Sequence, residues 1–147
     1  TRTRTPSEYE IYHNEYEILV DDEYDFLRAS VDGELSVDGR KGILEVKTAE
    51  PRNAEAWSEW KDSIPDNYYC QILHYLMVTG YDFAILTAHL IHTSYNETLT
   101  WAEDRRYFFD RKDVEDDIQT LKTAEIKFWN ENIIPRVAPN VKLRLGA

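Results

Sequence analysis

The sequence is poor in cysteine, in glycine-rich motifs and in long apolar runs. Its one cysteine, Cys70, excludes a disulfide within the chain and agrees with a reducing, cytoplasmic location. No apolar run approaches the ~20 residues that cross a bilayer, and no signal-peptide pattern occurs, so we expect no membrane partner. The four histidines lack zinc-ligand spacing and no Walker-type loop is present. These absences argue against a structural zinc site and a nucleoside triphosphate site.

Basic residues are also scarce, with 17 Lys and Arg against 28 Asp and Glu and a net charge of −11. This balance lowers the expectation of a nucleic-acid partner, because phosphate binding draws on Lys and Arg. A site built of carboxylates can nevertheless hold divalent cations, which bring positive charge to a phosphate. Composition alone therefore neither excludes nor predicts a nucleic-acid partner, and the sequence motifs are needed to distinguish the two cases.

A length of 147 residues with 42% hydrophobic residues fits one folded domain, 1–147. The first residue is not Met, and Thr5-Pro6-Ser7-Glu8 fits either a capped helical turn or the approach to a strand. The expected order is a run of strands, a helix, two strands and a final helix. This order predicts an α/β or α+β core with a mixed sheet flanked by helices. The predicted strands are 16–20, 25–31, 34–37, 43–49, 83–91 and 105–109, the predicted helices are 66–79 and 110 to about 132, and 135–147 is an expected loose tail.

Several local predictions accompany this outline. The apolar run 83–91 is typical of a central strand covered on both faces. The Asp38-Gly39 pair predicts a hairpin turn. Asp66 or Asn67 is expected to cap the helix that Gly80 ends. Residues 93–104 are expected to form a polar loop or hairpin.

The strand at residues 43–49 carries an acid and a base two positions apart, Glu45 and Lys47. Strand side chains alternate between faces, so these two point the same way and Leu44 and Val46 are expected to point into a core. Taken alone, a Glu–Lys pair is most often an exposed ion pair on a solvated strand.

A second acid, Asp32, ends the strand before Gly33, and it can converge with Glu45 and Lys47 if the two strands are neighbours. Mg²⁺ prefers oxygen ligands, commonly one or two carboxylates plus substrate phosphate oxygens. Asp32 and Glu45, with the Val46 backbone carbonyl, would bind such an ion, and Lys47 could orient or deprotonate water or stabilise charge on a phosphate.

The predicted helix 66–79 adds polar groups in a row, because Gln71 and Tyr75 are four residues apart and Tyr68 lies three before Gln71. Tyr69, the neighbour of Tyr68, diverges by ~100° and is expected to pack instead.

Taken in order, Ala-Ser-Val-Asp32-Gly-Glu-Leu, Ile-Leu-Glu45-Val-Lys47 and Tyr-Cys-Gln71-Ile-Leu-His-Tyr75 resemble the PD-(D/E)XK nuclease superfamily. Within it, the chain resembles the phage lambda-type exonuclease and viral recombinase branch from about residue 16 to 139. The resemblance implies a restriction-endonuclease-like fold. It also implies a Mg²⁺-dependent deoxyribonuclease, for which Mn²⁺ is a substitute.

The resemblance further implies roles for single residues. Asp32 and Glu45 match the metal-binding acids, the Val46 carbonyl a further ligand, Lys47 the catalytic lysine, and Gln71 and Tyr75 the helix motif beside the site. Members of this branch typically digest double-stranded DNA from a 5′ end, in a bacterial or phage-infected cell. They act with a single-strand annealing protein, and several form trimers.

The chain departs from the family pattern in two places. Val31 stands where the name-giving Pro usually lies, and an upstream helix bearing a further acid is not evident before residue 16. That acid is either among Glu8, Glu10, Glu15 and Glu17 or outside these residues, and a chain lacking it could be inactive. Two alternatives therefore stay open, an endonuclease of the same fold and a catalytically silent binding module.

Possible DNA contacts are weaker predictions. Tyr68, Trp57 and Trp60 could stack on bases, although core burial is equally expected for the two tryptophans. Arg52 and Lys61 lie in the same loop and could touch phosphates, although each is more often a solubility residue.

Overall fold

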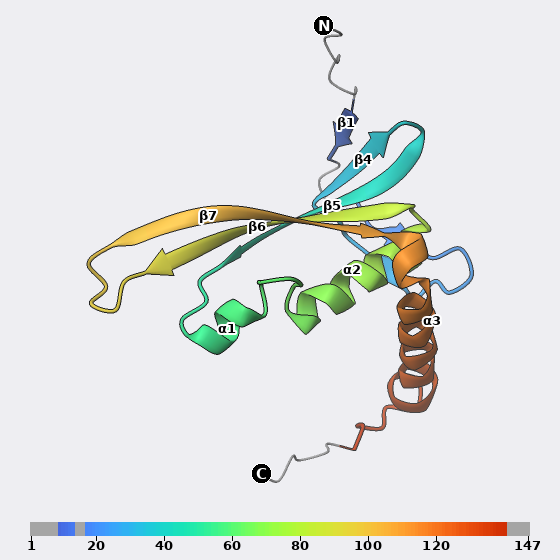
Figure 1. Cartoon of the computed structure of the whole chain (residues 1–147). Coiled ribbons are helices and arrows are strands. Elements are labelled where there is room, and N and C mark those ends of the chain that lie inside the picture. The colour runs from blue at the N-terminus through green and yellow to red at the C-terminus, as the bar shows by residue number, and fades with distance from the viewer. Residues whose placement is uncertain (1–8, 14–16, 141–147) are drawn as a thin grey trace, which may run out of the picture.

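The computed structural model describes residues 9–13 and 17–140 and is built on a five-stranded mixed sheet (Figure 1). In chain order the elements are β1 (Tyr9–Tyr12), β2 (Leu19–Val20), β3 (Arg28–Ala29), β4 (Gly33–Val37), β5 (Arg40–Ala49), α1 (Ala54–Ser58), α2 (Asp66–Thr79), β6 (Phe83–Thr93), β7 (Thr100–Asp110), α3 (Arg111–Phe128) and the π-helical turn η1 (Trp129–Ile133).

The main sheet has the order β1-β4-β5-β6-β7. Its neighbours are antiparallel except β5 and β6, which run parallel and are joined by a crossover that contains α2. Figure 1 shows α1, α2 and α3 on the same side of this sheet. The predicted mixed sheet flanked by helices is therefore confirmed, and the helices described here flank one face.

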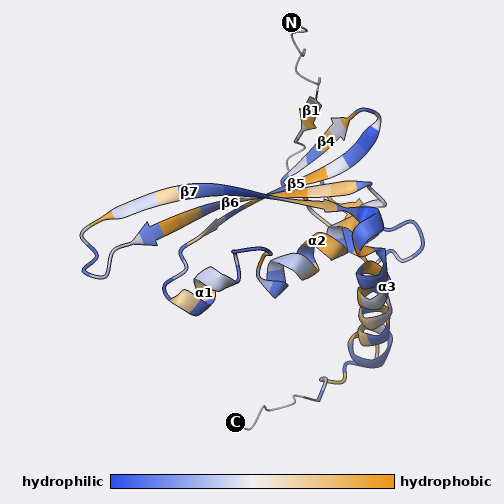
Figure 2. Cartoon of the chain, in the orientation of Figure 1, coloured by the Kyte–Doolittle hydropathy of each residue, from blue (hydrophilic) through white to orange (hydrophobic). Residues whose placement is uncertain are grey.

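The core lies between α2 and the covered face of the sheet. Figure 2 shows hydrophobic residues gathered where α2 meets the strands. Ile43 of β5, Ile72 and Leu76 of α2, and Leu86 and Leu90 of β6 are fully buried. Burial of each such side chain stabilises the fold by roughly 1.5–3 kcal/mol relative to exposure.

Two glycines shape the chain where the sequence predicted them. Asp38 and Gly39 have φ of 50° and 78°, and Val37 pairs directly with Arg40. This is the two-residue turn with positive φ that matches the twist of a hairpin, and it lets β5 begin three residues earlier than expected. Gly80, with φ of 67°, ends α2 in the left-handed conformation.

Within the described residues 17–20 and 25–31 of two predicted strands, only β2 and β3 have strand geometry, and residue 16 of the first prediction lies outside the described chain. The Asp21 carboxylate accepts hydrogen bonds from the backbone N–H groups of Glu23 and Tyr24, which folds the intervening chain into a turn. At the N-terminus residues 9–12 form a strand, and the candidate capping box at residues 5–8 lies outside the described residues.

β6 is interior in the sheet as predicted, but the expectation that both its faces are covered is wrong for the described part of the chain. Ala84, Leu86 and Ala88 are buried, whereas Thr87 is half-buried and His89 is exposed. This alternation follows from the placement of all three helices on one side of the sheet (Figure 1).

The remaining helix and loop predictions differ mainly at their ends. Pro65, and neither Asp66 nor Asn67, is the N-cap residue of α2. Of the loop and the hairpin expected for residues 93–104, the structure shows the hairpin: β6 and β7 pair up to Thr93 and Thr100, and residues 94–99 connect them. Asp110 caps α3 as predicted, and its side chain accepts from the Lys112 N–H. Residues 141–147 of the expected tail lie outside the described chain. No helix within residues 9–13 and 17–140 is long and apolar enough to cross a membrane.

Candidate active site

β5 places Glu45 and Lys47 on the face of the sheet that α2 covers. Glu45 is 2% exposed, whereas Val46 between them is 51% exposed and points to the opposite face. The expectation that Leu44 and Val46 point into the core is therefore wrong. Alternation was predicted correctly, but the helices cover the face that carries the charged pair.

Asp32 meets this pair through the register of the β4–β5 hairpin. Because Val37 pairs with Arg40 and Gly33 with Leu44, the residue before Gly33 lies beside Glu45. The Val46 backbone N–H donates to Asp32 Oδ2 at 2.8 Å. This hydrogen bond was not foreseen from the sequence, although the two-residue turn at Asp38-Gly39 contains the information needed to derive the register.

The Glu45 carboxylate is buried and only partly satisfied. Its Oε1 lies 2.5 Å from Lys47 Nζ, and its Oε2 is buried without a hydrogen-bond partner. Burial raises the pKa of Glu45, a shift that the hydrogen bond from Lys47 opposes and the charge of Asp32 reinforces. A buried acceptor without a partner is costly, and it indicates a position for a cation or donor.

Lys47 lies between an anion and an aromatic ring. Its side chain is 19% exposed, and its ammonium lies over the Tyr68 ring, 5.2 Å from the centroid, as well as beside Glu45. An ammonium in this position can stabilise negative charge that develops next to Glu45.

α2 completes the cluster with Gln71 and Tyr75. Gln71 Nε2 donates to the Tyr75 hydroxyl at 2.7 Å, as their spacing of four residues allows. Burial raises the pKa of Tyr75, and the negative charges of Glu45 and Asp32 add to the shift, so the phenol stays protonated near the two acids. The structure thus brings Asp32, Glu45, Lys47, Tyr68, Gln71 and Tyr75 to one place.

The carboxylate oxygens at the site are ligands that a hard divalent cation prefers, and two residues supply them. Asp32 and Glu45 supply carboxylate oxygens, and the unpartnered Oε2 of Glu45 is the atom that such an ion would satisfy. Within the described residues no group of three or more His, Cys, Asp and Glu side chains gathers in metal-binding geometry. Two protein carboxylates are nevertheless enough for Mg²⁺ sites that keep several waters and use substrate oxygens.

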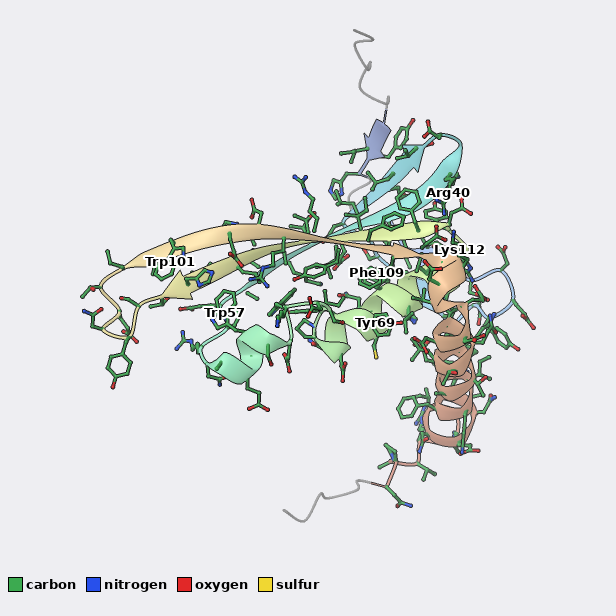
Figure 3. The ribbon with its side chains drawn as sticks, in the orientation of Figure 1. Arg40, Trp57, Tyr69, Trp101, Phe109 and Lys112 are labelled. Carbon is green, nitrogen blue, oxygen red and sulfur yellow. The ribbon has the colours of Figure 1, made fainter. Side chains whose placement is uncertain are left out.

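The weaker DNA-contact candidates separate in the structure. Trp60 is 2% exposed and belongs to the core, so the burial alternative holds for it. Trp57 is half-buried and stacks on His92, with ring centroids 4.0 Å apart, between α1 and the β6–β7 hairpin (Figure 3). Arg52 is exposed and pairs with Glu50, and Lys61 is exposed in the loop after α1.

These features define a mixed α+β domain with a carboxylate–lysine cluster on its central strand. Residues 3–82 match the family of YqaJ-like viral recombinase domains, and this chain belongs to that family. The matched range contains Asp32, Glu45, Lys47, Gln71 and Tyr75. The resemblance to the viral recombinase branch is thereby confirmed.

One curated relative is a longer protein than this chain. The chain is 33% identical over 124 residues to the uncharacterized protein YqaJ of Bacillus subtilis (strain 168), a match that covers 83% of this chain and 34% of that protein. The chain therefore spans about a third of the length of this curated relative.

Two solved structures are similar at a lower level. The alkaline exonuclease LHK-Exo from Laribacter hongkongensis matches with a TM-score of 0.42 and 14% identity, covering 88% of this chain and 65% of that one. SSO0001 matches with a TM-score of 0.40 and 17% identity, covering 69% and 41%.

Proposed function

We propose that this chain is the catalytic domain of a metal-dependent deoxyribonuclease of phage-type recombination, a 5′-to-3′ exonuclease on double-stranded DNA. The observation that carries the proposal is the Glu45 carboxylate, 2% exposed, with one oxygen on Lys47 and the other without a partner. Membership of the viral recombinase family supports a role in recombination.

Each residue of the cluster has a separate role in the proposed reaction. Asp32, Glu45 and the Val46 carbonyl would hold Mg²⁺, or Mn²⁺ in its place, which on binding lowers the pKa of a water and neutralises a phosphate oxygen. Lys47 orients or deprotonates the attacking water, or stabilises charge on the phosphate during in-line displacement. Gln71 and Tyr75 support the acids from α2, since their hydrogen bond lies next to both carboxylates.

DNA would approach the site from the side of α1, where Arg52 and Lys61 are exposed and Trp57 is half-buried. The net charge of −11 makes the bound cation important for this approach, because the chain has fewer Lys and Arg than Asp and Glu residues. A single-strand annealing protein as partner, a trimeric assembly and a location in the bacterial cytoplasm belong to the same proposal.

The test is Mg²⁺-dependent cleavage of linear and covalently closed circular double-stranded DNA by the wild type and by Lys47→Ala. We expect degradation of the linear substrate only, and its loss in Lys47→Ala with the circular dichroism spectrum unchanged. Lys127→Ala, an exposed change on α3, is the matched control and should cut normally. Normal cleavage by Lys47→Ala would refute the assigned role, and cleavage of closed circles would favour an endonuclease.

A second candidate, a catalytically silent nuclease fold that binds or assembles, is favoured by one observation. Only two carboxylates meet at the site in the described residues. Absence of both cleavage and divalent-cation binding in the wild type would support this alternative.

A further inference from the structure

Lys47 is a long, flexible side chain whose use at a reacting phosphate requires a fixed position. Its ammonium contacts Glu45 Oε1 at 2.5 Å on one side and the Tyr68 ring at 5.2 Å from the centroid on another. If Glu45 gives its carboxylate to a divalent cation, the ammonium loses its anionic partner and retains the ring. The ring is therefore the contact that can persist when the site is occupied.

The Tyr68 ring packs against a buried aromatic residue, Trp60. The centroids of the two rings lie 5.6 Å apart, and Trp60 is 2% exposed. The Trp60 carbonyl accepts hydrogen bonds from the Tyr107 hydroxyl at 2.6 Å and from Arg105 Nη1 at 2.7 Å, so two residues of β7 fix the loop that supports the ring. A ring supported in this way is pre-organised and does not have to be ordered when Lys47 packs against it.

The helical register assigns Tyr68 to the site rather than to the neighbouring core. Tyr68 lies three residues before Gln71 and seven before Tyr75, which places all three on one face of α2. Tyr69 points elsewhere, since its hydroxyl donates to Asp117 and its ring packs near Phe109, as Figure 3 shows. The expectation that Tyr69 packs is confirmed.

We propose that Tyr68 is a positioning residue whose ring holds the Lys47 ammonium at the reacting phosphate by a cation–π interaction. This inference rests on the proposed nuclease function and replaces base stacking as the role of Tyr68, because Lys47 lies over the ring and Trp60 lies beside it. The hydroxyl is not required for this role, so a phenylalanine should serve and an aliphatic residue should not.

The experiment compares Tyr68→Phe, which keeps the ring, with Tyr68→Leu, which keeps apolar volume and removes the ring. In steady-state cleavage of linear DNA with Mg²⁺, we expect Tyr68→Phe to match the wild type. Tyr68→Leu should lower kcat on the order of tenfold with KM little changed, as expected for loss of a desolvated cation–π contact. Tyr69→Leu, on the next helix position, is the control and should leave kcat unchanged.

A second readout needs neither metal nor DNA. In the NMR spectrum of the full chain, the ε-methylene protons of Lys47 should be displaced by the ring current of Tyr68. The displacement should persist in Tyr68→Phe and Tyr69→Leu and vanish in Tyr68→Leu, while dispersion elsewhere reports that the variant is folded.

The possible outcomes separate this inference from the function on which it rests. A raised KM with unchanged kcat in Tyr68→Leu would assign the ring to DNA binding and overturn the inference. So would an undisplaced Lys47 signal in the wild type, or a wild-type kcat in Tyr68→Leu. A wild type that cuts no DNA but shows the displacement would refute the nuclease proposal and leave the Tyr68–Lys47 contact established as a structural one.

Discussion

His74 joins three elements next to the candidate site, and its protonation should make the stability of the fold depend on pH. Its Nδ1 lies 2.9 Å from both carboxylate oxygens of Glu125 on α3, and its Nε2 lies 2.8 Å from the backbone carbonyl of Arg28 on β3. Both partners are acceptors, so both ring nitrogens act as donors only in the imidazolium form.

The direction of the pH dependence follows from these contacts. The hydrogen bond to Glu125 raises the pKa of His74 above its ordinary value, burial opposes the shift, and the Arg28 carbonyl and the charge of Glu125 add to it. A histidine with a raised pKa in the folded state contributes stability that is fully present below about pH 6.5. This contribution is lost as the pH rises through the pKa of the folded state.

Glu125→Gln is the perturbation that removes the charge and keeps the shape. A hydrogen bond between charged groups contributes roughly 1.5–3 kcal/mol, and His74 and Glu125 are 23% and 26% exposed, so little of this is lost to solvent screening. We expect the variant to lose about 2 kcal/mol of unfolding free energy at pH 5.5. The loss should be much smaller at pH 9, where His74 is neutral in both proteins.

Urea unfolding followed by tryptophan fluorescence across this pH range measures the effect. Asp104→Asn is the matched control, because the His89–Asp104 pair has a similar geometry at 2.7 Å but is 49% and 65% exposed. It should cost little at either pH. An equal loss for Glu125→Gln at pH 5.5 and pH 9, or a control loss as large as that of Glu125→Gln, would refute the reasoning.

Three substitutions test the packing around the site through thermal or urea unfolding. Gly42→Ala should destabilise by about 1–3 kcal/mol, because its Cβ would overlap the Phe83 ring, and an unchanged midpoint would contradict that contact. Trp60→Ala should cost about 3–5 kcal/mol as expected for a 2% exposed side chain, and a small loss would contradict its burial. Val46→Thr should stay within about 0.5 kcal/mol, since Val46 is 51% exposed, and a large loss would show that this face of the sheet is covered.

The features that the sequence predicted correctly are those that short-range chemistry decides. Asp38-Gly39 specifies a turn with positive φ, Gly80 ends a helix and Asp110 begins one, each through its own backbone conformation or capping group. The convergence of Asp32 with Glu45 is also local in origin, because the two-residue turn fixes the hairpin register.

The features that the sequence did not predict depend on which surfaces meet. Residues 43–48 alternate with apolar side chains on both faces, so the pattern alone could not say whether Glu45 or Val46 would be buried. The position of α2 decides it. The His74–Glu125 contact joins two residues that are 51 positions apart in the chain, and the Trp57–His92 stack joins α1 to β6. No local sequence signal marks such pairs.

Calorimetric titration of the wild type and Glu45→Gln with Mn²⁺ tests the central claim most directly. The claim is that Glu45 and Asp32 form a cation site beside Lys47. We predict that the wild type binds Mn²⁺, that Glu45→Gln abolishes this binding, and that Glu125→Gln, remote from the two acids in sequence, retains it. Absence of Mn²⁺ binding by the wild type, or undiminished binding by Glu45→Gln, would contradict the account.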